Sequence, residues 1–239
     1  MVTALIQHAR QHPQPWATGI ALAFHLSGVV AIGIFKSALF VRLTPLNLLV
    51  CLLLVLWTQP RRNRPFWIFC ITAAVTGFAA EWVGINHGLL FGQYKYGQVL
   101  GPGWQGVPFL IGVQWLVTMY CCGIAVQMLH QRFIKSQAGL YSTFPPWLMR
   151  ITLVTDAAFL AVAFDWILEP VAVQLGYWQW QNNQIPWSNY LSWWGVSLVI
   201  LTAFQRLSFT KHNLFAVHLL LIQTMFFLIL RTLVQFHQL

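Results

Sequence analysis

Long apolar runs separated by short polar segments are the feature that most constrains how this chain folds. An α-helix crosses a lipid bilayer with about 20 apolar residues, and runs of about that length recur along the sequence. Only 7% of the residues are charged, whereas soluble domains carry about 25%. The chain is therefore predicted to be an all-α, multi-pass integral membrane protein.

The apolar runs predict about seven transmembrane helices within a single membrane domain covering residues 1–239. Pro170 is expected to end the fifth helix, because proline disfavours helical backbone in the residue before it. The polar segment 1–15 lacks the layout of a signal peptide, so no cleavage is expected. The predicted spans are 16–35, 43–58, 66–85, 107–129, 147–169, 191–207 and 213–235.

The distribution of basic residues predicts the orientation, because cytoplasmic loops of membrane proteins carry an excess of Lys and Arg. Eight basic residues lie on the N-terminal side and three on the opposite side. The N-terminus is therefore predicted in the cytoplasm, and loops 86–106 and 170–190 share the far side. The eight are Arg10, Arg61, Arg62, Arg64, Arg132, Lys135, Arg206 and Lys211, and the three are Lys36, Arg42 and Lys95.

The two far-side loops share a pattern that predicts an internal repeat. Each follows an acid and a tryptophan, then has a glycine eleven residues after the acid and two aromatic residues just beyond it. This predicts two parallel repeat units, 66–129 (spans 3–4) and 147–207 (spans 5–6), whose acids face one cavity. The matching residues are Glu81, Trp82, Gly92, Tyr94 and Tyr96 in one unit and Asp165, Trp166, Gly176, Trp178 and Trp180 in the other.

All four acidic residues lie within or at the ends of predicted spans. An Asp at the centre of a membrane helix costs about 2.5–3.5 kcal/mol on insertion scales, so this placement predicts a polar interior or an enclosed site. Glu169 shares a helix face with Asp165, whereas Asp156 is rotated by about 180° from it. The candidate catalytic residues are Glu81, Asp165, Glu169 and Asp156; for Asp156, pairing with Arg150 or a neighbouring helix is the alternative.

Carboxyl groups that share a pocket of low dielectric constant do not all ionise, so one is expected to stay protonated. A carboxylic acid in an aromatic pocket can protonate an alkene, and aromatic faces stabilise the cation that forms. A membrane aromatic belt is the alternative interpretation of the Trp and Tyr residues. The candidate substrate-binding residues are Trp82, Tyr94, Tyr96, Trp166, Trp178 and Trp180, with Asn86, His87, Asn189 and Tyr190 as polar groups suited to hold a water.

Several other chemistries lack their motifs in this sequence. It has no histidine cluster for a di-iron site, no aspartate run at magnesium-binding spacing, no glycine-rich phosphate loop and no nucleic-acid motif. The last span has no lysine for a retinal Schiff base, and Cys51, Cys70, Cys121 and Cys122 lie in apolar runs as packing residues. No metal, cofactor or nucleic-acid partner is predicted.

Two stretches of the sequence carry a resemblance to a known family. The first runs from Glu81 through the Gly-x-Tyr-x-Tyr segment to Val107-Pro108, and the second runs from Asp165 to Tyr190. Together they resemble the membrane carotenoid-biosynthesis family, and within it the CruF-type carotenoid 1,2-hydratases, over about residues 66–207.

This resemblance implies an enzyme that adds water across the terminal C1–C2 double bond of an acyclic carotenoid end group, such as that of γ-carotene or lycopene. It implies a carotenoid substrate in contact with membrane lipid, no redox cofactor and no metal. It also implies a bacterial inner membrane or a thylakoid membrane, and it allows association with other enzymes of the same pathway.

Three alternatives stay open from the sequence. A more distant likeness is to membrane lycopene cyclases, but these carry acids just after the repeat proline, where this chain has Phe109-Leu110 and Trp187-Ser188. A transporter or binding protein for a lipophilic ligand also fits intramembrane acids and parallel repeats. A structural partner of other pigment enzymes is the third.

Overall fold

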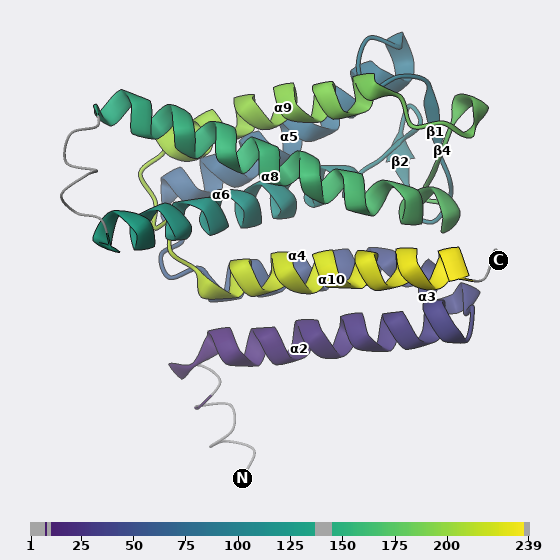
Figure 1. Cartoon of the computed structure of the whole chain (residues 1–239), viewed down its shortest axis with the longest axis horizontal. Coiled ribbons are helices and arrows are strands. Elements are labelled where there is room, and N and C mark those ends of the chain that lie inside the picture. The colour runs from purple at the N-terminus through teal and green to yellow at the C-terminus, as the bar shows by residue number, and fades with distance from the viewer. Residues whose placement is uncertain (1–7, 9–10, 137–144, 237–239) are drawn as a thin grey trace.

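The computed structural model describes residue 8 and residues 11–136 and 145–236, most of which lie in long helices side by side (Figure 1). Arg10, which entered the orientation count, lies outside the described residues. The helices are α2 (Pro13–Gly28), extended by the π-helical η1 (Val29–Ile34), α3 (Ala38–Arg42), α4 (Thr44–Thr58), α5 (Arg64–His87), α6 (Leu110–Ser136), α8 (Pro146–Gln174), α9 (Trp187–Arg206) and α10 (Leu214–Phe236).

The predicted class is confirmed: long apolar helices make up most of the described chain, which is an all-α integral membrane protein. Within the described part, five helices are long and apolar enough to cross a membrane. The second predicted span forms the shorter α4, and α9 is not among the five, so a total of seven spans stays a prediction. The five are Pro13–Ile34, Arg64–His87, Leu110–Phe133, Pro146–Gln174 and Leu214–Leu233.

The prediction that Pro170 ends the fifth helix is wrong, because α8 continues through it to Gln174. Proline has no backbone N–H, so it leaves the carbonyl four residues earlier without its helical partner. That carbonyl belongs to Trp166, and Arg231 of α10 donates to it from Nη1 at 3.5 Å. Neighbouring helices that supply such a donor allow proline inside membrane helices.

The helices form two groups (Figure 1). Helices α5, α6, α8 and α9 pack against one another, and α4 and α10 lie between this group and α2, with which they form the second group. Close approach inside the first group depends on Gly77 of α5, where a Cβ atom would collide with the Trp115 side chain of α6. The first group supplies the helices that surround the candidate site.

The two far-side loops meet in a short antiparallel strand pair at one end of the bundle (Figure 1). Strand β1 (Tyr94–Tyr96) pairs with β4 (Trp178–Trp180), with Lys95 opposite Gln179 at the centre. Beyond the pair, Gly97 N–H donates to the Tyr177 carbonyl at 2.9 Å. The smaller elements are β2 (Gly103–Trp104), which pairs with β3 (Val107–Pro108), and the 3₁₀ turn η2 (Gln181–Asn183).

Candidate active site

A small cavity of about 20 Å³ lies where helices α5, α6, α8 and α9 meet the β1–β4 pair. By volume it has room for about one water molecule. Its walls combine carboxyl groups, two amides and aromatic rings, with no Lys, Arg or His among the lining residues. The lining residues are Glu81, Phe91, Tyr94, Tyr96, Ile111, Gln114, Trp115, Asp165, Glu169, Trp178, Trp180, Asn189 and Trp193.

Three of the four predicted catalytic acids line this cavity. Glu81, Asp165 and Glu169 have exposed fractions of 5%, 1% and 2%. Carboxyl groups buried this deeply are stable only where donors or a shared proton compensate the loss of water. The hydrogen bonds of each carboxyl group therefore indicate how the site works.

The Glu81 carboxylate accepts three hydrogen bonds. Tyr94 and Tyr96 donate their hydroxyls to Oε2, the latter at 2.7 Å, and Trp115 donates Nε1–H to Oε1 at 3.0 Å. Burial and the adjacent Glu81 charge raise the pKa of both tyrosines above their usual value. Both hydroxyls therefore keep their protons and act as donors.

The Glu169 carboxylate accepts hydrogen bonds from the two tryptophans of the second aromatic loop. Trp178 and Trp180 donate their indole N–H groups to Oε2 at 3.0 and 2.8 Å. The repeat pattern predicts Glu81 and Asp165 as matched acids under the two loops, but the tryptophans bind Glu169, one turn beyond Asp165. An indole N–H lies closer to its own backbone than a phenol hydroxyl does, and Glu169 lies closer than Asp165 to the end of α8 from which this loop starts, which is consistent with the change of partner.

Asp165 is the least supported of the three carboxyl groups. Asn189 donates from Nδ2 to Asp165 Oδ2 at 2.8 Å, and the same nitrogen lies 3.5 Å from Glu169 Oε1. Oδ1 of Asp165 is buried and has no hydrogen-bond partner among the described residues. Asn189 thus joins the two acids of α8 and leaves one carboxyl oxygen unpaired.

Aromatic rings close the cavity on several sides. Trp115 and Trp193 stack with ring centroids 4.0 Å apart and planes at 17°. Tyr94 lies 4.9 Å from Trp180, and Tyr96 lies 6.0 Å from Trp178, measured between ring centroids. Such faces carry negative quadrupole charge, so the aromatic walls of the cavity favour a nearby positive charge.

Trp115, Trp193 and Gln114 are site residues that sequence reasoning missed. A signal for the two tryptophans is present, because each follows the proline that opens its span by seven residues, Pro108 and Pro186. The stacking of these equivalent rings, together with the pairing of Lys95 with Gln179, is the geometry that a two-fold relation between the repeat units would produce. The division into two units remains our proposal.

Five of the predicted binding residues lie outside the cavity lining. Trp82 stacks on Trp104 with centroids 5.8 Å apart and donates to Gln105 Oε1 at 2.5 Å. Asn86 and His87 contact the same cluster. The Trp166 ring lies against the Arg231 guanidinium, and the Tyr190 ring lies against Trp187. The five are Trp82, Asn86, His87, Trp166 and Tyr190, whereas Tyr94, Tyr96, Trp178, Trp180 and Asn189 line the cavity.

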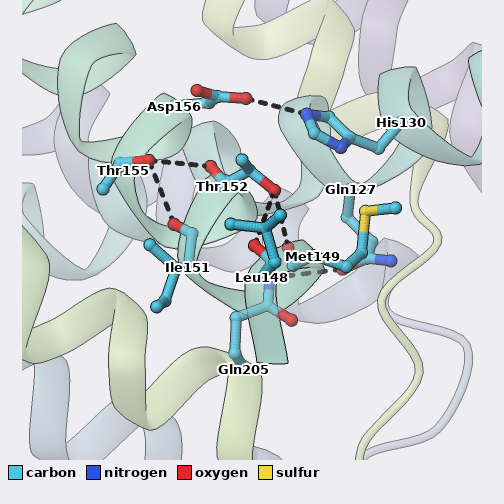
Figure 2. Close-up of polar contacts among 9 residues, drawn as sticks. All are labelled: Gln127, His130, Leu148, Met149, Ile151, Thr152, Thr155, Asp156 and Gln205. Carbon is cyan, nitrogen blue, oxygen red and sulfur yellow. Dashed lines mark hydrogen bonds and ion pairs between the residues drawn. The ribbon is translucent and has the colours of Figure 1, made fainter. Parts of the chain in front are cut away.

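Asp156 is the predicted catalytic acid that the structure does not bring to the others. Its side chain is 49% exposed, and Oδ2 lies 2.8 Å from Nε2 of His130 on α6 (Figure 2). Threonine side chains of the same stretch of α8 bond to backbone carbonyls of their own helix (Figure 2). Pairing with a neighbouring helix, the alternative considered for Asp156, describes its contact.

The described part of the chain contains no cluster of side chains suited to bind a metal ion. Within it, no three His, Cys, Asp or Glu residues are arranged to hold a metal ion. The four cysteines are free and buried. The carboxyl cavity is therefore the concentration of reactive side chains on which a functional assignment rests.

Comparison with known proteins places the chain in a family. No solved structure matches it. Bisanhydrobacterioruberin hydratase of Haloarcula japonica is 28% identical over 139 residues, which are 56% of this chain and 43% of the relative. The match thus spans less than half of that relative's length. A family model described as carotenoid biosynthesis protein matches residues 42–238, so the chain belongs to the carotenoid biosynthesis protein family.

Proposed function

We propose that the protein is a carotenoid hydratase that adds water across the terminal C1–C2 double bond of an acyclic end group, such as that of γ-carotene or lycopene. The observation that carries this proposal is the grouping of Glu81, Asp165 and Glu169 in one aromatic cavity with room for about one water. Membership of the carotenoid biosynthesis family and the hydratase name of the Haloarcula relative support the same chemistry.

The reaction needs one acid and one base. A protonated carboxyl group transfers its proton to C2, which leaves a tertiary cation at C1. The π-faces of the cavity's tyrosines and tryptophans stabilise this cation. A water molecule then bonds to C1 through oxygen and gives its extra proton to a carboxylate, so that the product is a tertiary alcohol.

The overall step consumes one substrate molecule and one water, and no electrons are gained or lost. The proton that leaves the acid is replaced by the proton that the base receives. Protein carboxyl groups are therefore sufficient for the proposed reaction, which requires neither a redox cofactor nor a metal.

The proposal is tested by producing the protein in bacteria that accumulate lycopene or γ-carotene and analysing the pigments by mass. We expect a product heavier than the substrate by one water. An unchanged mass with an altered absorption spectrum would instead indicate a cyclase. Unchanged pigment that stays bound to the purified protein would favour a transporter or binding protein, and unchanged, unbound pigment would contradict all enzyme assignments.

Single substitutions test whether the carboxyl groups of the cavity are needed to form the product. Glu81→Gln, Asp165→Asn and Glu169→Gln are each expected to lower product formation, because each removes a carboxyl group that lines the cavity. Asp156→Asn applies the same change to the acid that pairs with His130. Hydration retained in that variant removes Asp156 from the mechanism, and hydration lost would return it to the catalytic set.

A further inference from the structure

We infer that the three carboxyl groups have separate tasks: Asp165 delivers the proton to C2, Glu169 takes the proton of the attacking water, and Glu81 remains an anion that fixes the aromatic wall. This inference rests on the proposed hydratase function and extends it. It follows from the hydrogen bonds that each carboxyl group receives.

The cavity cannot hold three carboxylate charges without compensation. None of its lining residues is Lys, Arg or His, and all three acids are buried. Unpaired charges in such surroundings are strongly unfavourable, and like charges close together add repulsion. At least one of the three groups therefore carries a proton, and the question is which one.

Glu81 is the group best suited to remain an anion. It accepts from two phenol hydroxyls and one indole N–H, and these three bonds cover both of its oxygens. Hydrogen bonds to an ionised acceptor are roughly twice as strong as neutral ones. Because its oxygens are already engaged by donors of the wall, Glu81 is poorly placed to give a proton to a substrate.

Asp165 is the group best suited to hold the proton. It receives one donor, from Asn189 to Oδ2, and Oδ1 is buried with no partner in the described part of the chain. A charged oxygen left in this state would be more costly than any other in the cavity. A proton on Oδ1 removes that charge and provides an O–H in the cavity that Asp165 lines.

Glu169 is placed to act as the base. Both tryptophan donors bind Oε2, whereas Oε1 has only the 3.5 Å approach of Asn189. Oε1 thus has lone pairs available for the proton of a water in the same cavity. Asn189 is a positioning residue, since its single amide nitrogen lies within hydrogen-bond distance of both acids of α8.

The cycle closes with all atoms accounted for. The Asp165 proton forms the new C2–H bond, water supplies the C1–O bond, and the second water proton goes to Glu169. Transfer of that proton from Glu169 to Asp165, one helical turn away, restores the starting state. The net change is the addition of one water to the alkene.

Deuterium incorporation separates the tasks of Asp165 and Glu169. Purified protein in detergent is mixed with lycopene in D₂O, and both recovered substrate and product are analysed by mass. The native enzyme is expected to give product with one deuterium at C2. Glu169→Gln still protonates C2 but captures water slowly, so its cation loses a proton again and recovered lycopene carries deuterium.

Asp165→Asn is expected to give neither deuterated substrate nor product, with turnover lower by about 10²–10⁴-fold, the usual contribution of a general acid. Asp165→Glu, which keeps a carboxylic acid, is expected to restore part of the exchange. Thermal unfolding of each variant shows whether the loss reflects chemistry rather than folding, and the Asp165→Glu variant carries the test if Asp165→Asn does not fold.

Two outcomes would overturn the assignment. Deuterium exchange by Asp165→Asn would place the acid elsewhere, and loss of exchange in a folded Glu169→Gln variant would show that Glu169 is itself needed to protonate C2. Failure of the native protein to hydrate either lycopene or γ-carotene is a different result, because it contradicts the proposed function and not the division of tasks alone.

Discussion

The three buried carboxyl groups of the cavity accept hydrogen bonds from different segments of the chain. Tyrosines of β1 and Trp115 of α6 hold Glu81, whereas tryptophans of β4 hold Glu169. Because tryptophan N–H is only a donor, these contacts favour the charged form of the acids they reach. At the scale of single residues, the aromatic loops thus act through hydrogen bonds as well as through their ring faces.

Trp115→Phe isolates one such hydrogen bond. The smaller ring keeps an aromatic face toward Trp193 but leaves Glu81 Oε1 without its donor. We expect the free energy of unfolding to fall by about 1.5–3 kcal/mol, the range for hydrogen bonds to charged groups. Denaturation of purified protein in detergent measures the change.

Trp193→Phe is the matched control for that substitution. It makes the same change in ring size at the other half of the stacked pair, and Trp193 makes no hydrogen bond to the three carboxyl groups. A loss of stability as large as that of Trp115→Phe would show that ring packing, and not the bond to Glu81, dominates at this pair.

The candidate site could be predicted in part from the sequence. Glu81, Asp165 and the aromatic residues of both loops were found because they repeat at a fixed spacing, and Glu169 was found because it shares a helix face with Asp165. Gln114 was missed because only the fold shows which face of α6 meets the cavity, whereas Trp115 has a signal in the sequence, its shared spacing with Trp193 from the preceding proline. The change of partner from Asp165 to Glu169 depends on side-chain reach, which spacing does not contain.

At the scale of elements, α8 shows how a proline is retained inside a membrane helix. The Trp166 carbonyl, which Pro170 leaves free, accepts from Arg231, and the guanidinium also lies 4.7 Å from the Trp166 ring centroid. Sequence rules correctly mark Pro170 as a helix breaker, but they do not include a donor supplied by α10. The helix boundary was therefore mispredicted for a tertiary reason.

A double-mutant cycle tests this account of α8. Arg231→Met is expected to destabilise the protein, because it removes both the hydrogen bond to the Trp166 carbonyl, worth about 0.5–1.5 kcal/mol, and the contact with the Trp166 ring. In a Pro170→Ala background the backbone N–H returns and satisfies Trp166, so Arg231→Met should cost less. The cycle removes the cation–π contribution, which both backgrounds share. Equal costs in the two backgrounds would show that Arg231 acts only through the ring.

At the scale of the whole molecule, the far-side loops connect the site to both helix groups. The β1–β4 pair joins the loops to each other, and the Tyr177 hydroxyl lies 2.8 Å from Thr44 Oγ1 of α4. The long apolar helices and their order could be predicted from hydropathy because a bilayer requires continuous apolar helices. The strand pair could not, since it joins two segments far apart in the sequence.

These loop tyrosines give the molecule a defined response to alkaline pH. Burial raises the pKa of Tyr177 to about 12, and it raises the pKa values of Tyr94 and Tyr96 as well, from a usual value of 10.0. The folded state therefore retains these protons when the unfolded chain has lost them. Stability from this source is complete below pH 10 and falls as the pH rises above it.

Tyr177→Phe tests the contribution of one tyrosine. The variant loses the contact with Thr44 at every pH, but it also loses the titration, so its stability should decline less steeply above pH 10. Between pH 10 and 12 the difference in slope should reach about 1.4 kcal/mol per pH unit. Unfolding free energies of both proteins, measured in detergent from pH 7 to 11.5, provide the comparison. Parallel curves above pH 10 would show that Tyr177 titrates alike in the folded and unfolded chain, and that its burial does not couple the loops to pH.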